Sequence, residues 1–426
     1  GAAREPVHPL EFEKPSRVSV TWRLAWRNLW RHGRRTWLTI GAMVFCNVLL
    51  IFLISLQLGS YQMMIDNSLA AFTGHIQVQH RGYLEEQRMR QSVPAVRALA
   101  DEVRDTLGVQ TVAARGLAFA LASSEERSFG VLISGIQPEF EPQVSTFPGL
   151  VKRGRYLAPG DSEHIVIGAV LARNLKIGLG DELTFLGSGR DGSFSAGVAT
   201  VVGIVDSGID EIDRSVAQVP LPWFQDMFSM DDHGHSVVVR LPALGDVPGA
   251  VEALETALAD RDSLDVLDWN ALQPGLRQAI TSDMASAWFT YAVLIVLVAF
   301  SVLNTQLMSV LERTREFGVM LALGMRPGQL ARLVGMESLL MALLGLALGV
   351  LMGWMLAAYL ADVGFAYPGM EELGARFNMP GRMYPEVSLL SLFWGPGVVM
   401  LGALIAAIYP ALRLFRLAPV QAMRAV

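Results

Sequence analysis

The amino-acid sequence predicts a membrane protein with four transmembrane α-helices and a large α+β extracytoplasmic domain inserted between the first and second helix. The first observation behind this fold class is composition. Of 426 residues, 52% are hydrophobic and only 17% are charged, and the mean hydropathy is +0.38. This is too apolar for an ordinary soluble enzyme. The second observation is four apolar stretches of the roughly 20 residues that cross a bilayer. The third is a series of strand signals between the first two stretches.

The amino-terminal segment combines a polar tail with a membrane anchor. Residues 1–20 are polar and contain proline, which predicts a loose cytoplasmic tail. Residues 21–60 are expected to form an amphipathic interfacial helix followed by transmembrane helix 1, since "TWRLAWRNLWRHGRRTW" places Trp and Leu on one helical face and Arg on another. The apolar run is too long for a cleavable signal peptide, so we expect a retained anchor. Cys46, the single cysteine, lies in this span, where a packing role is favoured over a reactive or lipidated one.

Residues 61–283 are predicted to form the extracytoplasmic domain. Between Asp66 and Asp283 the chain has 17 basic and 30 acidic residues, a net charge of −13. Without cysteine, this region has no disulfide. Alternating or short apolar runs bounded by turn residues predict strands at 74–79, 129–136, 164–170, 181–187, 199–205 and 235–241. Helical pieces are expected at 93–107, 169–175 and 247–259.

The remaining elements follow from apolar length and arginine placement. They are transmembrane helix 2 (284–311), a cytoplasmic coupling helix (312–329), transmembrane helix 3 (330–360), a short periplasmic loop (361–388), transmembrane helix 4 (389–412) and a cytoplasmic C-terminus (413–426). Arginines cluster before the first span, between the second and third, and after the fourth. The positive-inside rule therefore predicts that both termini are cytoplasmic and that the large domain lies outside.

No catalytic or metal site is predicted. A phosphate-binding loop requires Gly-Lys followed by Ser or Thr, but Lys14, Lys152 and Lys176 are followed by Pro, Arg and Ile. The stretch "DDHGH" at 231–235 contains two histidines beside two carboxylates; a solvated turn is the favoured interpretation and a metal cluster the alternative. The two histidines at 75 and 80 are expected to be exposed at a strand edge.

Transmembrane helix 3 carries two features that need an explanation. Glu337 stands near the start of the span, where a carboxylate is costly unless it is paired or hydrated. It is therefore either a functional residue or an interfacial acid paired with Arg332 or Arg326. Small residues recur every four positions farther along the span, a spacing that allows close helix packing, at Gly345, Gly349 and Gly353.

The segment "ERTREFGVMLALGMRPGQL" after transmembrane helix 2 is amphipathic. Phe317, Met320, Leu321 and Gly324 recur at helical spacing and form an apolar stripe, and the charged side chains lie off it. Gly324 suits a helix end, and the proline three residues later suits the first turn of a new helix. The pattern predicts a short cytoplasmic helix with one adhesive face; the alternative is a simple connector on the inner leaflet.

This segment, extended to "ERTREFGVMLALGMRPGQLARLVGMESLL", resembles the signature of MacB/FtsX-like ABC-transporter permeases. The positions that match are Arg315, Glu316, Phe317, Gly318, Leu323, Gly324 and Glu337, with Phe317 where the family usually has an aliphatic residue. "AWRNLWRHGRRTWLT" and "YPALRLFRLAPVQAMRA" are similar to the family's two end motifs. The segment "AFTGHIQVQHRGY" is similar to lipoprotein-releasing permeases of the LolC/LolE-like branch.

The resemblance implies a mechanotransmitting permease subunit in the bacterial inner membrane. The ATPase-coupling residues would be Arg315, Glu316, Phe317, Gly318, Met320, Leu321, Leu323 and Gly324. A separate cytoplasmic ABC ATPase would bind ATP and Mg, so no cofactor is expected on this chain. The other expected partners are a second or related permease, membrane lipids and a periplasmic acceptor or adaptor, without nucleic acid.

The function implied is transport of lipoproteins or another lipidic substrate toward the outer membrane. Efflux of peptides or amphiphiles, or mechanical regulation of a cell-wall hydrolase without transport, are the alternatives.

Overall fold

The computed structural model describes residues 17–31, 33–370, 372 and 381–414. The chain divides into two compact units, which are described separately. The helical unit comprises Gly1–Ser60, Ser282–Phe365 and Met383–Val426. The sheet unit comprises Tyr61–Thr281 and Ala366–Arg382.

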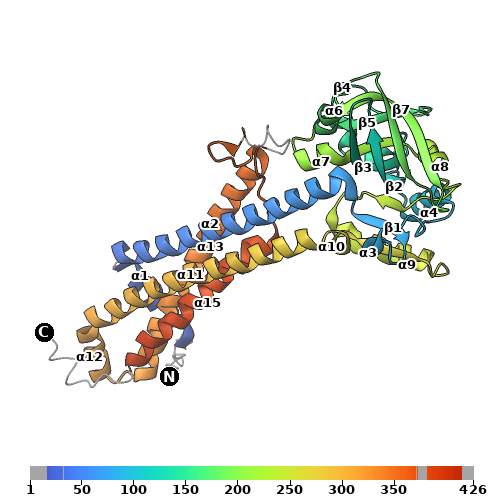
Figure 1. Cartoon of the computed structure of the whole chain (residues 1–426). Helices are drawn as coiled ribbons and strands as arrows, with labels where there is room; N and C mark the ends of the chain where they lie inside the picture. The colour runs from blue at the N-terminus through green and yellow to red at the C-terminus, as the bar shows by residue number, and fades with distance from the viewer. Residues whose placement is uncertain (1–16, 32, 371, 373–380, 415–426) are drawn as a thin grey trace, which may run out of the picture. The chain divides into compact units, whose positions relative to one another are not determined.

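The helical unit is built from long apolar helices (Figure 1). Its helices are α1 (Arg17–Arg31), α2 (Gly33–Ser68), α11 (Pro274–Glu312), α12 (Thr314–Ala322), α13 (Pro327–Val363) and α15 (Leu389–Arg413). Within the described ranges, α2, α11, α13 and α15 are long and apolar enough to cross a membrane. The predicted fold class, with four spanning helices, is confirmed.

Several helices are longer than the apolar segments that predicted them. Helix α2 continues to Ser68, and α11 begins at Pro274, ten residues before the predicted start at residue 284. Polar turns outside the hydrocarbon core can continue a helix, but they do not contribute to an apolar run. Helix α1 begins at Arg17, inside the predicted tail, whose residues 1–16 lie outside the described part of the chain. Positions 371, 373–380 and 415–426, in the predicted loop and C-terminus, also lie outside it.

Apolar clusters hold the helical unit together. Ala25 and Leu29 of α1 pack with Leu333, Leu340 and Met341 of α13, so α1 is attached to the start of that span. Cys46 is buried with Leu50 and Val399, consistent with the predicted packing role. At the opposite end of α13 the chain forms a short bridge, where the backbones of Phe365 and Met383 exchange hydrogen bonds of 2.7 and 2.8 Å.

The sheet unit contains a ten-stranded mixed sheet in its described residues (Figure 1). The strands are β1 (Ile76–His80), β2 (Val112–Ser123), β3 (Ser128–Ile136), β4 (Val151–Gly154), β5 (His164–Gly168), β6 (Glu182–Ser188), β7 (Phe194–Val205), β8 (Val216–Pro220), β9 (Ser236–Val239) and β10 (Leu264–Asp268). Their order is β10-β1-β9-β2-β3-β8-β5-β7-β4, and β6 pairs with β2 and β7. Only the β3–β8 and β5–β7 pairs among these are parallel.

Short helices cover the sheet and complete its core. They are α3 (Tyr83–Glu86), α4 (Val96–Leu107), α5 (Glu141–Val144), α6 (Ala169–Leu175), α7 (Asp210–Ser215), α8 (Leu221–Met227), α9 (Val247–Ala257) and α10 (Trp269–Leu272), with 3-10 turns η2 (Phe147–Leu150) and η3 (Leu244–Asp246) and the π-helical turn η1 (Leu69–Thr73). Phe224 of α8 lies directly over Gly116 and Gly135, where a Cβ atom would come within 2.2 and 2.5 Å of its side chain. These glycines allow α8 to pack closely on β2 and β3.

All six predicted strands are present, as β1, β3, β5, β6, β7 and β9. The sequence did not predict β2, β4, β8 or β10. Strand β2 reads "VAARGLAFALAS", and alanine and glycine have low strand propensity. Strand β4 has only four residues, two of them basic, and β10 carries two aspartates. The three predicted helices correspond to α4, α6 and α9.

Candidate functional site

The short helix α12 is set off from the spans on either side by defined chain ends. After Ala322 the chain closes in a Schellman motif, in which the N–H groups of Met325 and Gly324 donate to the carbonyls of Met320 (3.1 Å) and Leu321 (3.0 Å). Gly324 has φ of +95°, a conformation that disfavours any residue with a side chain. Pro327 then opens α13 at its first turn. The turn therefore holds α12 at a fixed angle to α13.

The predicted apolar stripe of α12 faces the protein's own interior. Phe317 is fully buried among Val310, Leu330, Val334 and Leu414, and Met320 and Leu321 pack against the same cluster. Gly318 is also buried. This corrects the expectation that the stripe itself is the adhesive surface, because these side chains are already occupied by intrachain contacts.

The outward edge of α12 carries a different set of residues. Arg315 and Val319 are exposed, and Leu323 leaves 82% of its surface open. They are spaced four residues apart and so lie along one helical edge. We call Arg315, Val319 and Leu323 the outer ridge. Two of its three side chains are apolar, so this edge of α12 leaves apolar surface open that no described residue covers.

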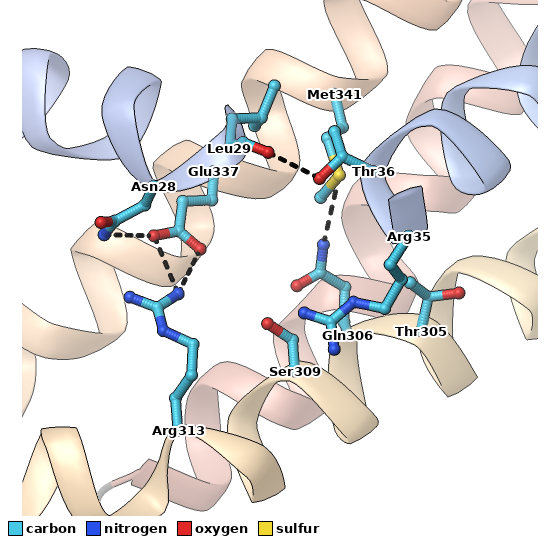
Figure 2. A pocket seen from close by; sticks show the side chains of 10 residues that line it. All are labelled: Asn28, Leu29, Arg35, Thr36, Thr305, Gln306, Ser309, Arg313, Glu337 and Met341. Carbon is cyan, nitrogen blue, oxygen red and sulfur yellow. Dashed lines mark hydrogen bonds and ion pairs between the residues drawn. The ribbon is translucent and has the colours of Figure 1, made fainter. Parts of the chain in front are cut away.

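Glu337 is buried and paired (Figure 2). Arg313 Nη1 donates to both of its carboxylate oxygens, at 3.1 Å to Oε1 and 2.9 Å to Oε2, and Asn28 Nδ2 donates to Oε1 at 2.9 Å. The partner is therefore Arg313, neither Arg332 nor Arg326. Sequence proximity suggested the wrong arginines, because the loop between α12 and α13 folds back and brings the end of α11 beside α13.

Further ion pairs extend from this buried pair toward the surface. Arg313 Nε lies 3.5 Å from Glu316 Oε2, and Arg31 Nη2 lies 3.3 Å from Glu316 Oε1. The Arg313 guanidinium also stands 4.9 Å from the Phe317 ring centroid. We call Asn28, Arg31, Arg313, Glu316 and Glu337 the polar cluster. It connects α1, α12 and α13 through side chains that come from three separate parts of the sequence.

The energy of the polar cluster is concentrated in its buried part. The Arg31–Glu316 pair is 65% and 37% exposed, so solvent screening leaves it about 0–1 kcal/mol. The Arg313–Glu337 pair is 6% and 8% exposed, and removing one partner of such a pair costs about 3–5 kcal/mol. A cavity of about 20 Å³ beside the pair, lined also by Thr36, Gln306 and Ser309, has room for roughly one water molecule. The cluster is thus a connecting site and has no room for a substrate.

The three predicted packing glycines of α13 face α2. A Cβ atom at Gly345, Gly349 or Gly353 would come within 2.9, 2.5 and 2.6 Å of Met43, Asn47 and Ile51, respectively. Asn47 Nδ2 also donates to the Gly345 carbonyl at 3.1 Å. The glycine spacing therefore lets the side chains of α2 lie directly against the backbone of α13, and the Asn47–Gly345 hydrogen bond joins the two spanning helices.

Two histidines of the sheet unit, His75 and His235, have structural roles. His235 is buried, its Nδ1 accepts a hydrogen bond from Leu117 N (3.0 Å), and its ring stacks on Tyr83. Burial lowers the pKa of His235 to about 4. His75 is buried too, and its Nδ1 accepts from Leu241 N (2.8 Å). The turn itself is solvated at Asp231 and Asp232, as predicted, and His80 is only partly buried. The prediction is corrected at His235 and His75 alone, because the sheet folds these two side chains inward. No group of His, Cys, Asp or Glu that could hold a metal occurs among the described residues.

Together these features define a membrane-spanning protein with a large sheet domain, in which a short surface helix is fixed between two spans. The sequence matches the FtsX-like permease C-terminal model over residues 288–419 and the MacB-like periplasmic core domain over residues 36–257. The chain therefore belongs to the MacB/FtsX-like ABC-transporter permease family. Members of this family work with a cytoplasmic ATPase.

The relatives agree with this assignment. The chain is 23% identical over 329 residues to the lipoprotein-releasing system transmembrane protein LolC of Neisseria meningitidis serogroup B, covering 72% of this chain and 75% of that one. It is 26% identical over 317 residues to LolC of Xylella fastidiosa, covering 70% and 74%. It is also 37% identical over 122 residues to the macrolide export ATP-binding/permease protein MacB of Shewanella oneidensis, covering 29% and 16%.

Proposed function

We propose that this chain is the permease subunit that receives ATP-driven motion from a separate cytoplasmic ATPase through α12 and passes it to the sheet unit. The observation that carries this proposal is the construction of α12. Its inner face is anchored by Phe317 and by the Arg313–Glu337 pair, and its outer ridge is left open. A load applied to an anchored helix moves the spans attached to it, whereas a loosely held helix would absorb the load.

Arginine placement supports an orientation with α12 in the cytoplasm. Arg23, Arg27 and Arg34 are exposed near the start of α2, and Arg315 and Arg326 are exposed around α12. The positive-inside rule places these short basic segments in the cytoplasm and the acidic sheet unit outside. In a bacterial cell this corresponds to the inner membrane, with the sheet unit in the periplasm.

The outer ridge is the proposed ATPase contact. Leu323 and Val319 suit an apolar groove on the partner, and Arg315 suits an acidic rim beside it. This moves the contact away from Phe317 and Gly318, which act as anchors. ATP and Mg would be bound by the ATPase, and this chain would supply no catalytic group.

A second permease is the expected partner within the membrane. Of the most apolar part of α11, only 11% is buried, compared with 44% for α2. A spanning helix with so few intrachain contacts is the natural place for a second copy or a related permease.

The proposed transport substrate is a lipoprotein or another lipidic molecule. Support comes from the two LolC relatives, which match across about three-quarters of their own length. Efflux of an amphiphile is the second candidate, because the MacB relative has the higher identity over its shorter match. Proteoliposomes containing the permease, its ATPase and a labelled lipoprotein separate the two. ATP-dependent release of the lipoprotein to a soluble acceptor is expected, and export of a macrolide without any lipoprotein release would favour efflux.

The docking step has its own test. Leu323→Asp should reduce ATPase capture by the solubilised permease at least tenfold, because a charge would be buried in the apolar contact. Leu179→Asp is the matched control, since Leu179 is an exposed leucine of the sheet unit. Equal capture by both variants would show that the outer ridge is not the ATPase contact.

A further inference from the structure

Helix α2 ends in the π-helical turn η1, which belongs to the sheet unit, and the backbone carbonyls of this turn have unusual hydrogen-bond partners. A helix end leaves its last backbone carbonyls without intrahelical partners, and local residues or water usually satisfy them. Here the Leu69 carbonyl accepts from Gly74 N at 2.8 Å, and the Thr73 carbonyl accepts from Gln77 Nε2 at 2.7 Å. The three carbonyls between them accept from residues far away in the sequence.

One segment, Glu141–Thr146, and one strand residue supply those three contacts. Thr146 N donates to the Ala70 carbonyl at 2.8 Å, and Ser145 Oγ donates to the Ala71 carbonyl at 3.1 Å. Arg115 of β2 donates through Nη1 to the Phe72 carbonyl, and its guanidinium stands 4.5 Å from the Phe72 ring centroid. The sheet unit therefore caps successive carbonyls of the turn from outside the helix.

Arg115 is itself held in place by a buried carboxylate. Its Nη2 and Nε donate to Glu141 Oε1 and Oε2 at 2.6 and 3.2 Å, and the two side chains are 2% and 0% exposed. Burying two charges costs several kcal/mol each, and apolar replacements of such pairs are often neutral or stabilising. Stability alone therefore does not explain the pair. The planar, five-donor guanidinium does offer a geometry that an apolar residue cannot, because it binds a carboxylate and a carbonyl at once.

We infer that η1 with Arg115, Glu141, Ser145 and Thr146 is a rigid joint that makes the sheet unit follow the helix ending in this turn. Arg115 and Glu141 act as positioning residues. Rotating or sliding the helix end would break all three external contacts together, so motion of the helix is passed to the sheet instead of being lost in a flexible linker. A second tie strengthens the joint, because Gln273 accepts from Ser68 Oγ (2.7 Å) and donates to Thr73 Oγ1 (2.8 Å). This inference rests on the proposed mechanotransmitting function.

The test uses the full-length permease with its ATPase and measures two quantities separately: the distance distribution across the joint and the substrate released per ATP hydrolysed. Spin labels at Met64→Cys and Glu125→Cys, both exposed, report the distance between the helix end and the sheet, and the native Cys46 is buried. Arg115→Met with Glu141→Leu removes the joint's charges at similar volume. Arg81→Met with Asp265→Leu removes an exposed pair of the same unit as the matched control.

The parent and the control should give one narrow distance distribution, with or without ATP. The joint variant should broaden it, accelerate hydrogen exchange of amides 71–74 by at least about tenfold, and lower lipoprotein release per ATP hydrolysed at unchanged ATPase rate. A narrow distribution, or normal release despite a broad one, would overturn the inference. Absence of release from the parent would count against the proposed substrate, while the distance measurement would still decide the joint.

If the double variant does not fold, Ser145→Ala with Gln273→Leu provides the test of the joint, because it removes contacts to η1 and leaves the buried Arg115–Glu141 pair intact. It should broaden the distribution in the same direction by a smaller amount. A distribution as narrow as that of the parent would contradict the joint.

Discussion

Removing the charge of Glu337 tests the anchoring of α12. Glu337→Gln keeps the size of the side chain and one acceptor oxygen, but it leaves the buried Arg313 guanidinium with only the partly exposed Glu316 carboxylate, 3.5 Å from its Nε, as counter-charge. Both Arg313 and Glu337 are more than nine-tenths buried, so the cost belongs to the buried class, about 3–5 kcal/mol. Arg313→Met should cost a similar amount, because it leaves the carboxylate unpaired. Arg313→Met with Glu337→Leu should recover most of the loss.

The assay combines thermal unfolding of the purified permease with ATPase coupling in proteoliposomes. The two single variants should have lowered Tm values and a reduced release of substrate per ATP. The double variant should regain Tm but not coupling, because its apolar contact no longer holds Asn28 of α1 and Glu316 has lost its arginine partner at position 313. Equal Tm values for the parent and both single variants would refute the claim that this pair anchors α12. Full coupling in the double variant would show that the pair contributes stability alone.

Three further predictions concern other parts of the chain. The pKa of His235 is about 4 in the folded state and 6.5 when unfolded, so between these pH values only the unfolded state binds the extra proton. The free energy of unfolding of the sheet unit should therefore fall by about 3 kcal/mol as the pH drops from about 6.5 to about 4. His235→Gln should make this free energy, measured by hydrogen exchange, less dependent on pH. Gly349→Ala should destabilise the helical unit by about 1–3 kcal/mol through overlap with Asn47, whereas Gly335→Ala, on the same helix with nothing within 4 Å of its Cβ, should leave Tm unchanged or raised. Phe317→Ala should open a cavity that costs about 3–5 kcal/mol of stability, and it should weaken ATPase capture. Unchanged capture would show that the packing of Phe317 does not contribute to ATPase docking.

Apolar length and periodicity predicted the membrane architecture because those patterns depend only on local sequence. The four spans, the close-packing glycines of α13, the end of α12 at Gly324 and the start of α13 at Pro327 follow from residue type and spacing. Strand β2 was missed because it is rich in alanine and places Gly116 beneath Phe224 of α8, a reason that is visible only after the sheet has formed.

The polar contacts depended on tertiary proximity and were harder to predict. The cost of an acid at the start of a span identified Glu337, but its partner Arg313 could not be chosen from among nearby arginines without the fold. Asn28 and Glu141 carried no signal of their own, since each acts through a residue more than twenty positions away. The orientation of α12 was also ambiguous, because an apolar stripe can face the chain's own core or a partner.

Site-specific crosslinking from α12 to the ATPase tests the central claim most directly. A photoreactive side chain placed at Leu323 should crosslink to the ATPase in the assembled complex, with a yield that changes when ATP is bound. The same group at Leu179 should give no crosslink. Strong ATPase crosslinks from other segments, with none from Leu323, Val319 or Arg315 in an active complex, would contradict the account.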